Sequence, residues 1–222
     1  MRSVDDRSTP PDDRSTRARV RDVAVEVFAR EGFGATVRTI AEAAGVSPGL
    51  VIHHFGSKEA LRAECDDHVL ALTRQANAAK LASDPNGSVL GALMGRMDVL
   101  EEDGPRIVYL IRSVQAGGQM ARDLLDHLAV DVEKTVRDGV ASGAIRPSLD
   151  EAARARYLVS YSMGTLLVDI TMHPPDDWSD VGAILRAYVD RVVVPATEMA
   201  VHGIMTDPTL LDAVVSYQED RR

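Results

Sequence analysis

The sequence predicts an all-α fold of about nine or ten helices, and three observations support this prediction. Segments with clear hydrophobic periodicity follow the helical spacing, and none alternates convincingly as a strand. Clusters of Gly and Pro separate these segments along the chain. With 222 residues and 45% hydrophobic content, the chain is long and apolar enough to bury a core in one or two domains.

The first element that carries a function lies at residues 36–58, whose sequence is T-V-R-T-I-A-E-A-A-G-V-S-P-G-L-V-I-H-H-F-G-S-K. This segment predicts two short helices joined by a turn at Gly45, which readily adopts a positive φ. Ser47 is the expected N-cap of the second helix, with Pro48 at its first position. Three apolar side chains of the second helix are expected to face inward, namely Leu50, Val51 and Phe55. The pattern indicates a helix-turn-helix, which places a short helix in the major groove of DNA.

The same region resembles the N-terminal domain of the tetracycline-repressor (TetR) family of bacterial transcription regulators. The resemblance begins with R-D-V-A-V-E-V-F-A-R-E-G at residues 21–32, which matches the first helix of that family. It continues into F-G-S-K-E-A-L at residues 55–61, where the long fourth helix opens, so it covers roughly the first third of the chain. The chain departs from the family at Ile52, where an aromatic residue, most often tyrosine, is usual. His53 or His54 is placed to replace part of that contact.

The predicted DNA contacts follow from positions on the two short helices. The N-terminus of the second helix offers backbone amides and the positive end of the helix dipole to a phosphate. One turn further on, His53 faces a base edge or phosphate, whereas His54 is more consistent with a packed or rim position. Lys58 resembles the phosphate-contacting lysine of the family. The complete predicted set is Arg38, Thr39, Ser47, Pro48, Gly49, Leu50, Ile52, His53, His54 and Lys58, with Leu50 and Ile52 either touching a thymine methyl group or packing in the scaffold.

The distribution of charge agrees with a DNA-binding head on an acidic body. The whole chain has a formal net charge of −9, from 25 Lys and Arg residues against 34 Asp and Glu residues. Residues 14–58 carry a net charge of +3, which leaves −12 on the remainder. Repulsion between the acidic body and the phosphates should keep the body off the duplex. Charge alone would also fit two ordinary solvated surfaces, and the helix-turn-helix separates these alternatives.

After Lys58 the chain reads as a series of helices with identifiable ends. Their expected ranges are 58–82, 89–102, 106–116, 119–141, a helix ending near Met172 that a capping box of Ser148 and Glu151 opens, 180–202 with a bend at Pro195, and a short helix begun by Asp207 and Pro208. We expect three regions: an N-terminal arm at 1–13, which reads as disordered, a helix-turn-helix domain at 14–60, and a ligand-binding and dimerisation domain at 61–222.

Two of the later helices, near residues 150–172 and 180–202, predict an assembly surface. Their apolar residues spread over more than one face, and Ser162 and Gly164 allow close approach. Periodicity alone fits equally well with two helices buried inside the monomer. The family resemblance implies a homodimer through these helices. A second reason is that one short recognition helix reads few base pairs, so specificity requires two half-sites of a palindromic operator.

The body is expected to hold a sensor site for a small molecule. Pockets in helical bundles are mostly apolar with a few polar groups, and methionine adapts well to such cavities. Arg112 stands out because a charged group on an apolar helix needs an anionic partner or a place at the surface. Taken singly, each candidate fits a core or surface position better than a ligand contact. The candidates are Met94, Met97, Tyr109, Arg112, Gln115, Met120, Tyr157, Tyr161 and Met163.

Other classes of function find little support in the sequence. There is no G-x-S-x-G, phosphate-binding loop or H-E-x-x-H pattern, so we expect neither catalysis nor a cofactor. Asp123, His127 and Asp131 share one helix face, but a solvated face explains them better than a metal site. The single cysteine, Cys65, suits a reducing cytoplasm, and no apolar run is long enough to span a membrane.

These observations predict a homodimeric transcription regulator, most consistent with a repressor that a small-molecule effector releases from operator DNA. The alternative is a DNA-binding module without an effector, either constitutive or controlled by a partner protein. A relic head on a helical enzyme or carrier is a further alternative.

Overall fold

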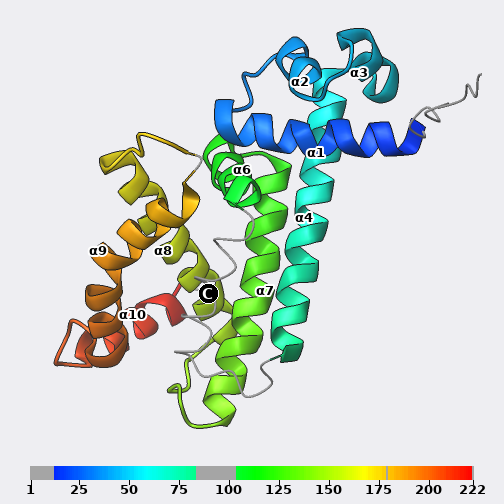
Figure 1. Ribbon diagram of the computed structural model, residues 1–222. Helices are drawn as coiled ribbons and strands as arrows, with labels where there is room; N and C mark the ends of the chain where they lie inside the picture. Colours follow the sequence, from blue (N-terminus) through cyan, green and yellow to red (C-terminus); the bar gives the residue numbers. More distant parts are fainter. Residues whose placement is uncertain (1–12, 84–103, 179, 222) are drawn as a thin grey trace, which may run out of the picture.

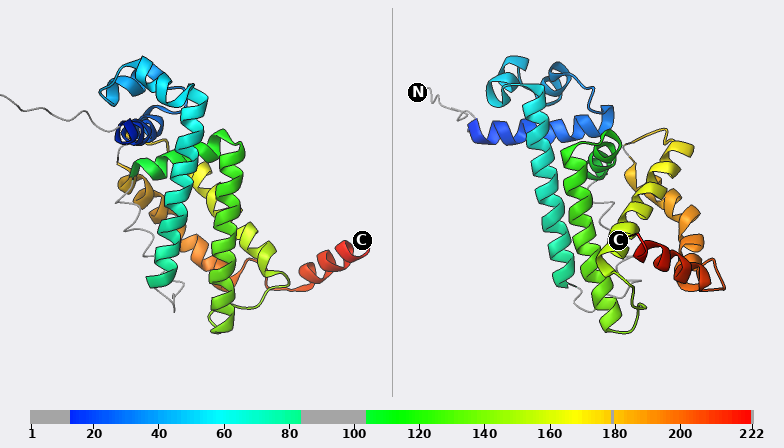
Figure 2. Two further views of the ribbon diagram at one scale, coloured as in Figure 1. Left: turned by 90° about the vertical axis from the view of Figure 1, so that its right-hand side faces the viewer. Right: turned by 180° about the vertical axis from the view of Figure 1, so that it is seen from behind.

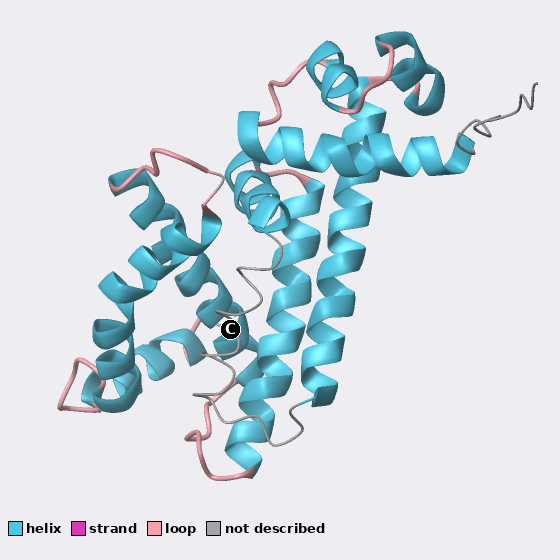
Figure 3. Cartoon of the chain, in the orientation of Figure 1, coloured by secondary structure: helices cyan, strands magenta, loops and turns pink. Residues whose placement is uncertain are grey.

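The computed structural model describes residues 13–83, 104–178 and 180–221, and within these ranges every regular element is a helix (Figures 1 and 3). Nine helices are present there, labelled α1–α4 and α6–α10. The predicted all-α class is therefore confirmed. The helix expected at residues 89–102 lies outside the described ranges, as does almost all of the expected N-terminal arm.

Four helices form the head of the molecule: α1 (Asp13–Glu31), α2 (Val37–Ala43), α3 (Pro48–Phe55) and the first turns of α4 (Lys58–Ser83). α1 crosses α4, and α2 and α3 lie together at one end of the molecule (Figure 1). The buried residues of α1 include Val20, Ala24, Val27 and Phe28, whose spacing places them on one face. This face packs against α2, α4 and α6.

Local sequence sets the ends of the short helices, and the cap at Ser47 and the turn at Gly45 are those that the sequence predicted. The Thr36 side chain caps α2 by accepting a bond from Thr39 N (3.1 Å), and Ser47 caps α3 with Pro48 at its first position. The chain turns between α2 and α3 at Gly45, whose φ of 66° favours glycine. The Val46 amide then donates to the Ala41 carbonyl (2.9 Å), which closes the turn.

The body consists of α6 (Gly104–Ala116), α7 (Gln119–Ala141), α8 (Glu151–Met172), α9 (Val181–His202) and α10 (Thr209–Glu219), together with the rest of α4. α4 and α7 are long and run side by side in all views, while α6 packs across α1 (Figures 1 and 2). α7 makes its most extensive contact with α8. α10 has no buried residue and stands away from the bundle (Figure 2).

The start of α8 differs from the predicted capping box in one respect. Asp150, not Ser148, is the N-cap, and its carboxylate accepts a bond from Ala153 N (2.9 Å). The predicted Glu151 contribution is present, because its carboxylate accepts a bond from Ser148 N (2.9 Å). A carboxylate is an equally good acceptor for the first free amides of a helix, so Asp150 displaces the neighbouring hydroxyl from this role.

A single hydrophobic cluster joins the head to the body. It contains Phe28 and Ile40 from the head, Leu61 from α4, and Tyr109 and Leu124 from the body, all almost fully buried. α4 also runs without a break through the expected domain boundary between residues 60 and 61. The head and the body therefore share one packed core rather than forming two separately packed units. None of the helices in the described ranges is long and apolar enough to cross a membrane.

Candidate nucleic-acid interface

The recognition helix α3 has a buried, apolar inner face and an accessible outer face. Val51 and Phe55 are buried against the head core, as predicted, and Leu50 is half-buried. Pro48, Gly49 and His53 are exposed, and Ile52 keeps 42% of its surface accessible. The inner residues hold the helix in place, and the outer residues remain available to a groove of DNA.

The N-terminus of α3 presents its backbone outward. The Ser47 hydroxyl accepts a bond from Leu50 N (3.2 Å), and Pro48 has no amide hydrogen, so the Gly49 amide precedes the first helical bond. A Cβ atom placed on Gly49 would meet only Ser47 Oγ, at 3.9 Å. The fold therefore does not require glycine here, whereas close approach of a phosphate to the backbone would.

The predicted DNA contacts that lie before and after α3 in the sequence differ in their exposure and hydrogen bonding. Arg38 is exposed on α2, whereas the Thr39 hydroxyl is hydrogen-bonded to the Thr36 hydroxyl (2.9 Å). Lys58 is the first residue of α4 and follows a turn at Gly56, whose φ is 79°. Because only two residues separate the helices, the start of α4 lies close to the C-terminal end of α3.

The structure adds a residue that the sequence prediction missed. Arg17 on α1 donates hydrogen bonds to the His54 carbonyl and to Glu64, and its guanidinium lies 4.6 Å from the centre of the Phe55 ring. It thereby ties α1 to both α3 and α4. His54 is half-buried with its ring beside Phe55, which agrees with the packed or rim position expected for it. No local pattern marks Arg17, because its partners lie 37 and 47 residues away in sequence.

The nine predicted ligand contacts are not brought together in the described part of the body. Tyr109 and Met120 belong to the core, Gln115 is exposed, and Met163 is half-buried. Tyr157 and Tyr161 lie on an exposed surface of α8 with their rings stacked at 6.1 Å. Met94 and Met97 lie outside the described residues.

Arg112 and the polar residues of α7 have partners within the chain. The Arg112 guanidinium bonds to backbone carbonyls at the end of α1, so its charge is met without an anionic ligand. His127 pairs with Asp131 at 3.4 Å, while Asp123 accepts a bond from Gln119 (2.7 Å). In the ranges that the structure covers, no three His, Cys, Asp or Glu side chains are grouped to hold a metal ion.

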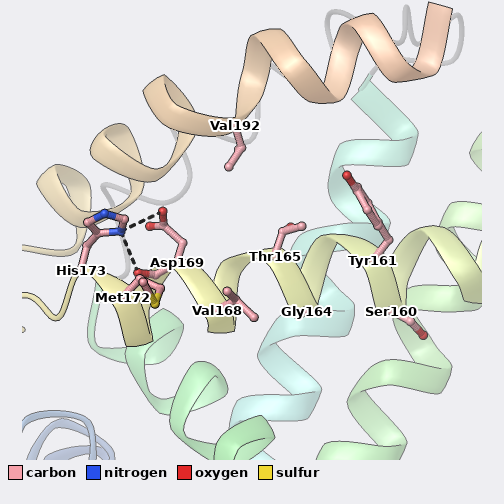
Figure 4. Close-up of a pocket in the computed structure, with 9 residues that line it drawn as sticks. All are labelled: Ser160, Tyr161, Gly164, Thr165, Val168, Asp169, Met172, His173 and Val192. Carbon is pink, nitrogen blue, oxygen red and sulfur yellow. Dashed lines mark hydrogen bonds and ion pairs between the residues drawn. The ribbon is translucent and has the colours of Figure 1, made fainter. Parts of the chain in front are cut away.

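An open groove of about 510 Å³ lies between α8 and α9 (Figure 4). Apolar side chains such as Val168, Met172 and Val192 line it, together with Gly164. At one end Arg191 donates two bonds to Asp169 (2.7 and 2.6 Å), which holds the pKa of that carboxyl below its usual range. A largely apolar groove that opens to solvent fits a second helical surface better than an enclosed small molecule.

The capped, outward-facing α3 on a scaffold of α1, α2 and α4 defines a helix-turn-helix DNA-binding protein. Family models agree: residues 20–65 match "Bacterial regulatory proteins, tetR family", and residues 101–206 match "Tetracyclin repressor-like, C-terminal domain". The chain is 40% identical to the HTH-type transcriptional regulatory protein RaaS of Mycobacterium tuberculosis, over 92% of this chain and 93% of that protein. It is 30% identical to the HTH-type transcriptional repressor AcnR of Corynebacterium efficiens, over 81% and 78%. The chain belongs to the TetR family of transcriptional regulators.

Solved structures show the same fold at low sequence identity. FadR from Bacillus subtilis, crystallised in complex with stearoyl-CoA, superposes with a TM-score of 0.58 at 19% identity, over 85% of this chain and 99% of that one. A TetR regulator from Chloroflexus aurantiacus gives 0.57 at 20% identity, over 82% and 96%. These likenesses extend beyond the head to the helical body. Its membership of the TetR family makes the protein a DNA-binding transcriptional regulator and not an enzyme, as predicted.

Proposed function

We propose that the protein acts as a homodimeric repressor that binds a palindromic operator and is released by a small molecule bound in the body. The observation that carries this proposal is the outer face of α3, where Pro48, Gly49, Ile52 and His53 are accessible while Val51 and Phe55 anchor the helix. A helix of eight residues reads few base pairs, so a specific operator needs two such helices related by a two-fold axis.

The surface that supports dimerisation is the exposed face of α8 and α9. Large apolar side chains remain accessible there in the single chain, and contiguous patches of this kind mark interaction sites. Gly164 has open space around it, since a Cβ atom would meet nothing within 4 Å, and this permits close helix approach. The exposed apolar residues of this face are Tyr157, Leu158, Tyr161, Val168 and Met172 on α8, and Val194, Met199 and Val201 on α9.

The switch follows from the shared packing of head and body. A ligand in the body would displace α4, which carries Lys58 at its head end, and so change the separation of the two recognition helices. These helices must lie about 34 Å apart to enter successive major grooves. An effector must bind the released state more tightly than the DNA-bound state, because equal affinity shifts no equilibrium.

The proposal is tested with a palindromic duplex selected in vitro by the purified protein. Sedimentation should show a dimer, and titration should show two protomers bound to each duplex. Candidate effectors are then added to the complex while fluorescence anisotropy is recorded. If every compound that binds the body leaves the affinity for DNA unchanged, the effector-free alternative replaces the switch.

Two substitutions separate the contributions to DNA binding. Lys58→Ala should weaken binding to all sequences and reduce the magnitude of the salt-dependence slope by about one per protomer, because a phosphate contact is lost. His53→Ala should change sequence preference by about 1–3 kcal/mol at one position, with little change in the salt slope. Equal losses on operator and random DNA for His53→Ala would remove it from the base-reading set.

A further inference from the structure

Arg112 connects three segments that lie far apart in the sequence. It belongs to α6, yet its Nε donates to the Ala29 carbonyl (2.6 Å) and its Nη2 to the Arg30 carbonyl (3.1 Å). The same guanidinium lies 4.8 Å from the ring centre of Trp178, in the connection between α8 and α9. One side chain therefore contacts the head, the body and the segment that leads into α9.

The two carbonyls belong to the last turn of α1, which ends at Glu31. The final carbonyls of a helix have no partner inside the helix and carry the negative end of its dipole. A guanidinium satisfies two of them at once, because its donors are held in a rigid planar fork. Gly32 lets the guanidinium approach, because a Cβ atom there would lie only 3.3 Å from Arg112 Nη1. Its φ of 81° also favours glycine at this position.

One turn earlier on α6, Tyr109 makes a second link to the head. Its hydroxyl donates to the Asp66 carboxylate on α4 (2.6 Å), and its buried ring packs edge-on against Phe33 (5.2 Å). A second point of attachment restricts rotations that a single point leaves free. Because α6 holds α4 through Tyr109 and the end of α1 through Arg112, these contacts restrict how the head can turn on the body.

We propose that Arg112 is a positioning residue for operator binding: by fastening the C-terminal end of α1 to α6 and Trp178, it sets the orientation in which the body presents α3. The proposal rests on the dimeric operator complex proposed above, in which that orientation sets the spacing of the recognition helices. Arg112 touches no DNA in this scheme. Its loss should therefore impair binding to two correctly spaced half-sites and spare the contacts within each half-site.

The orientation is measured directly by pulsed electron resonance within one protomer. Spin labels are attached at Ala43→Cys on α2 and Asp126→Cys on α7, both exposed positions, and the labelled chain is diluted with unlabelled protein. The native Cys65 should not be labelled, because it is fully buried and burial raises the pKa of its thiol to about 12. Arg112→Met should broaden or shift the distance distribution between head and body, because it keeps most of the side-chain volume and removes both hydrogen bonds.

The matched control is Arg122→Met. Arg122 makes its bonds to Gln119 on its own helix (3.2 and 2.9 Å), so its loss removes no link between elements. Its distance distribution should equal that of the wild type. Arg112→Lys keeps the charge but loses the planar fork, and Trp178→Leu removes the stacking surface. If circular dichroism shows that Arg112→Met is unfolded, these two variants carry the test and should give smaller shifts in the same direction.

DNA binding provides the second readout. Arg112→Met should lower the affinity for the selected palindromic duplex by about tenfold, within the usual range of coupling between sites, and leave the affinity for a single half-site unchanged. Equal losses on both duplexes would overturn the positioning role, as would a distance distribution identical to those of wild type and Arg122→Met. Should the wild type prefer no palindrome, the dimeric operator complex fails, while the distance measurement still decides whether Arg112 orients the head.

Discussion

The head and the α8–α10 region treat their apolar residues in opposite ways. In the head, apolar side chains such as Phe28, Ile40 and Val51 are buried, whereas Ile52 on the outer face of α3 remains exposed. In α8–α10, large apolar side chains remain exposed, and α10 has no buried residue. The head therefore leaves little apolar area exposed and suits a charged, hydrated partner. In contrast, α8 and α9 expose apolar area of the kind that another protein surface covers.

The largest expected effect on stability distinguishes a buried side chain of the head from an exposed side chain of the α8–α10 region. Phe28→Ala should lower the free energy of unfolding by about 4 kcal/mol, because the fully buried ring contacts Phe33 and Tyr109 and its removal leaves a cavity. Leu211→Ala, on α10 at a position that is 57% exposed and outside the proposed dimer face, should change it by less than about 0.5 kcal/mol. Denaturant titration of both variants measures the difference. Similar values for the two would show that the α10 position is buried in solution.

The next largest effect is expected on dimer formation, which should depend on α8 and not on the head. Val168→Glu, on the exposed face of α8, should leave the secondary structure intact and raise the dimer dissociation constant by about 100-fold, since it places a charge inside an apolar contact. Analytical ultracentrifugation over a range of concentrations gives this constant. Glu42→Lys on exposed α2 is the control, and it should leave the dimer unchanged. A Val168→Glu protein that remains dimeric would remove this face from the interface.

The hydrogen bond between Tyr109 on α6 and Asp66 on α4 should have a smaller effect on stability, and this effect should depend on pH. Tyr109→Phe should lower the free energy of unfolding at pH 7 by about 2 kcal/mol, the scale of a hydrogen bond to a charged group. Burial raises the pKa of Asp66, and the Tyr109 hydroxyl opposes that rise by stabilising the carboxylate. Without the hydroxyl the pKa of Asp66 rises further. The loss in the free energy of unfolding is therefore greatest at pH values above that pKa, and it shrinks as the pH falls and Asp66 becomes protonated.

This prediction is checked by denaturant titration across the acidic range. Tyr157→Phe is the matched control, because that tyrosine is exposed, and it should show no comparable pH dependence. A Tyr109→Phe loss that stayed constant from neutral to acidic pH would mean that the hydroxyl does not act through the ionised Asp66.

The smallest expected effect separates folding from DNA binding within α3. Gly49→Ala should raise the free energy of unfolding by about 0.5–1 kcal/mol, because alanine favours a helix and the Cβ atom has room. The same methyl group should weaken DNA binding if a phosphate approaches this backbone closely. Thermal unfolding and anisotropy titration on one preparation give both values. Gain in both stability and affinity would place the phosphate elsewhere.

Much of the head was predicted from sequence because its signals are local. The predicted cap at Ser47 and the predicted turn at Gly45 depend on residues within a few positions of each other. The same reasoning failed in detail at α8, where Asp150 and Ser148 compete for one role two residues apart. It also treated Arg112 as a candidate ligand contact, since its actual partners are backbone carbonyls that no side-chain pattern reveals.

The sequence by itself determined the helical class, the ends of most helices and the exposed face of the recognition helix, because hydrophobic periodicity and capping act over one or two turns. Only the tertiary structure decided how the head is fastened to the body. Arg17 reaches α3 and α4, Tyr109 reaches Asp66, and Arg112 reaches carbonyls up to 83 residues away. Such contacts arise when packed helices cross, so their partners are set by the geometry of the whole chain and leave no trace in the spacing of residues along it.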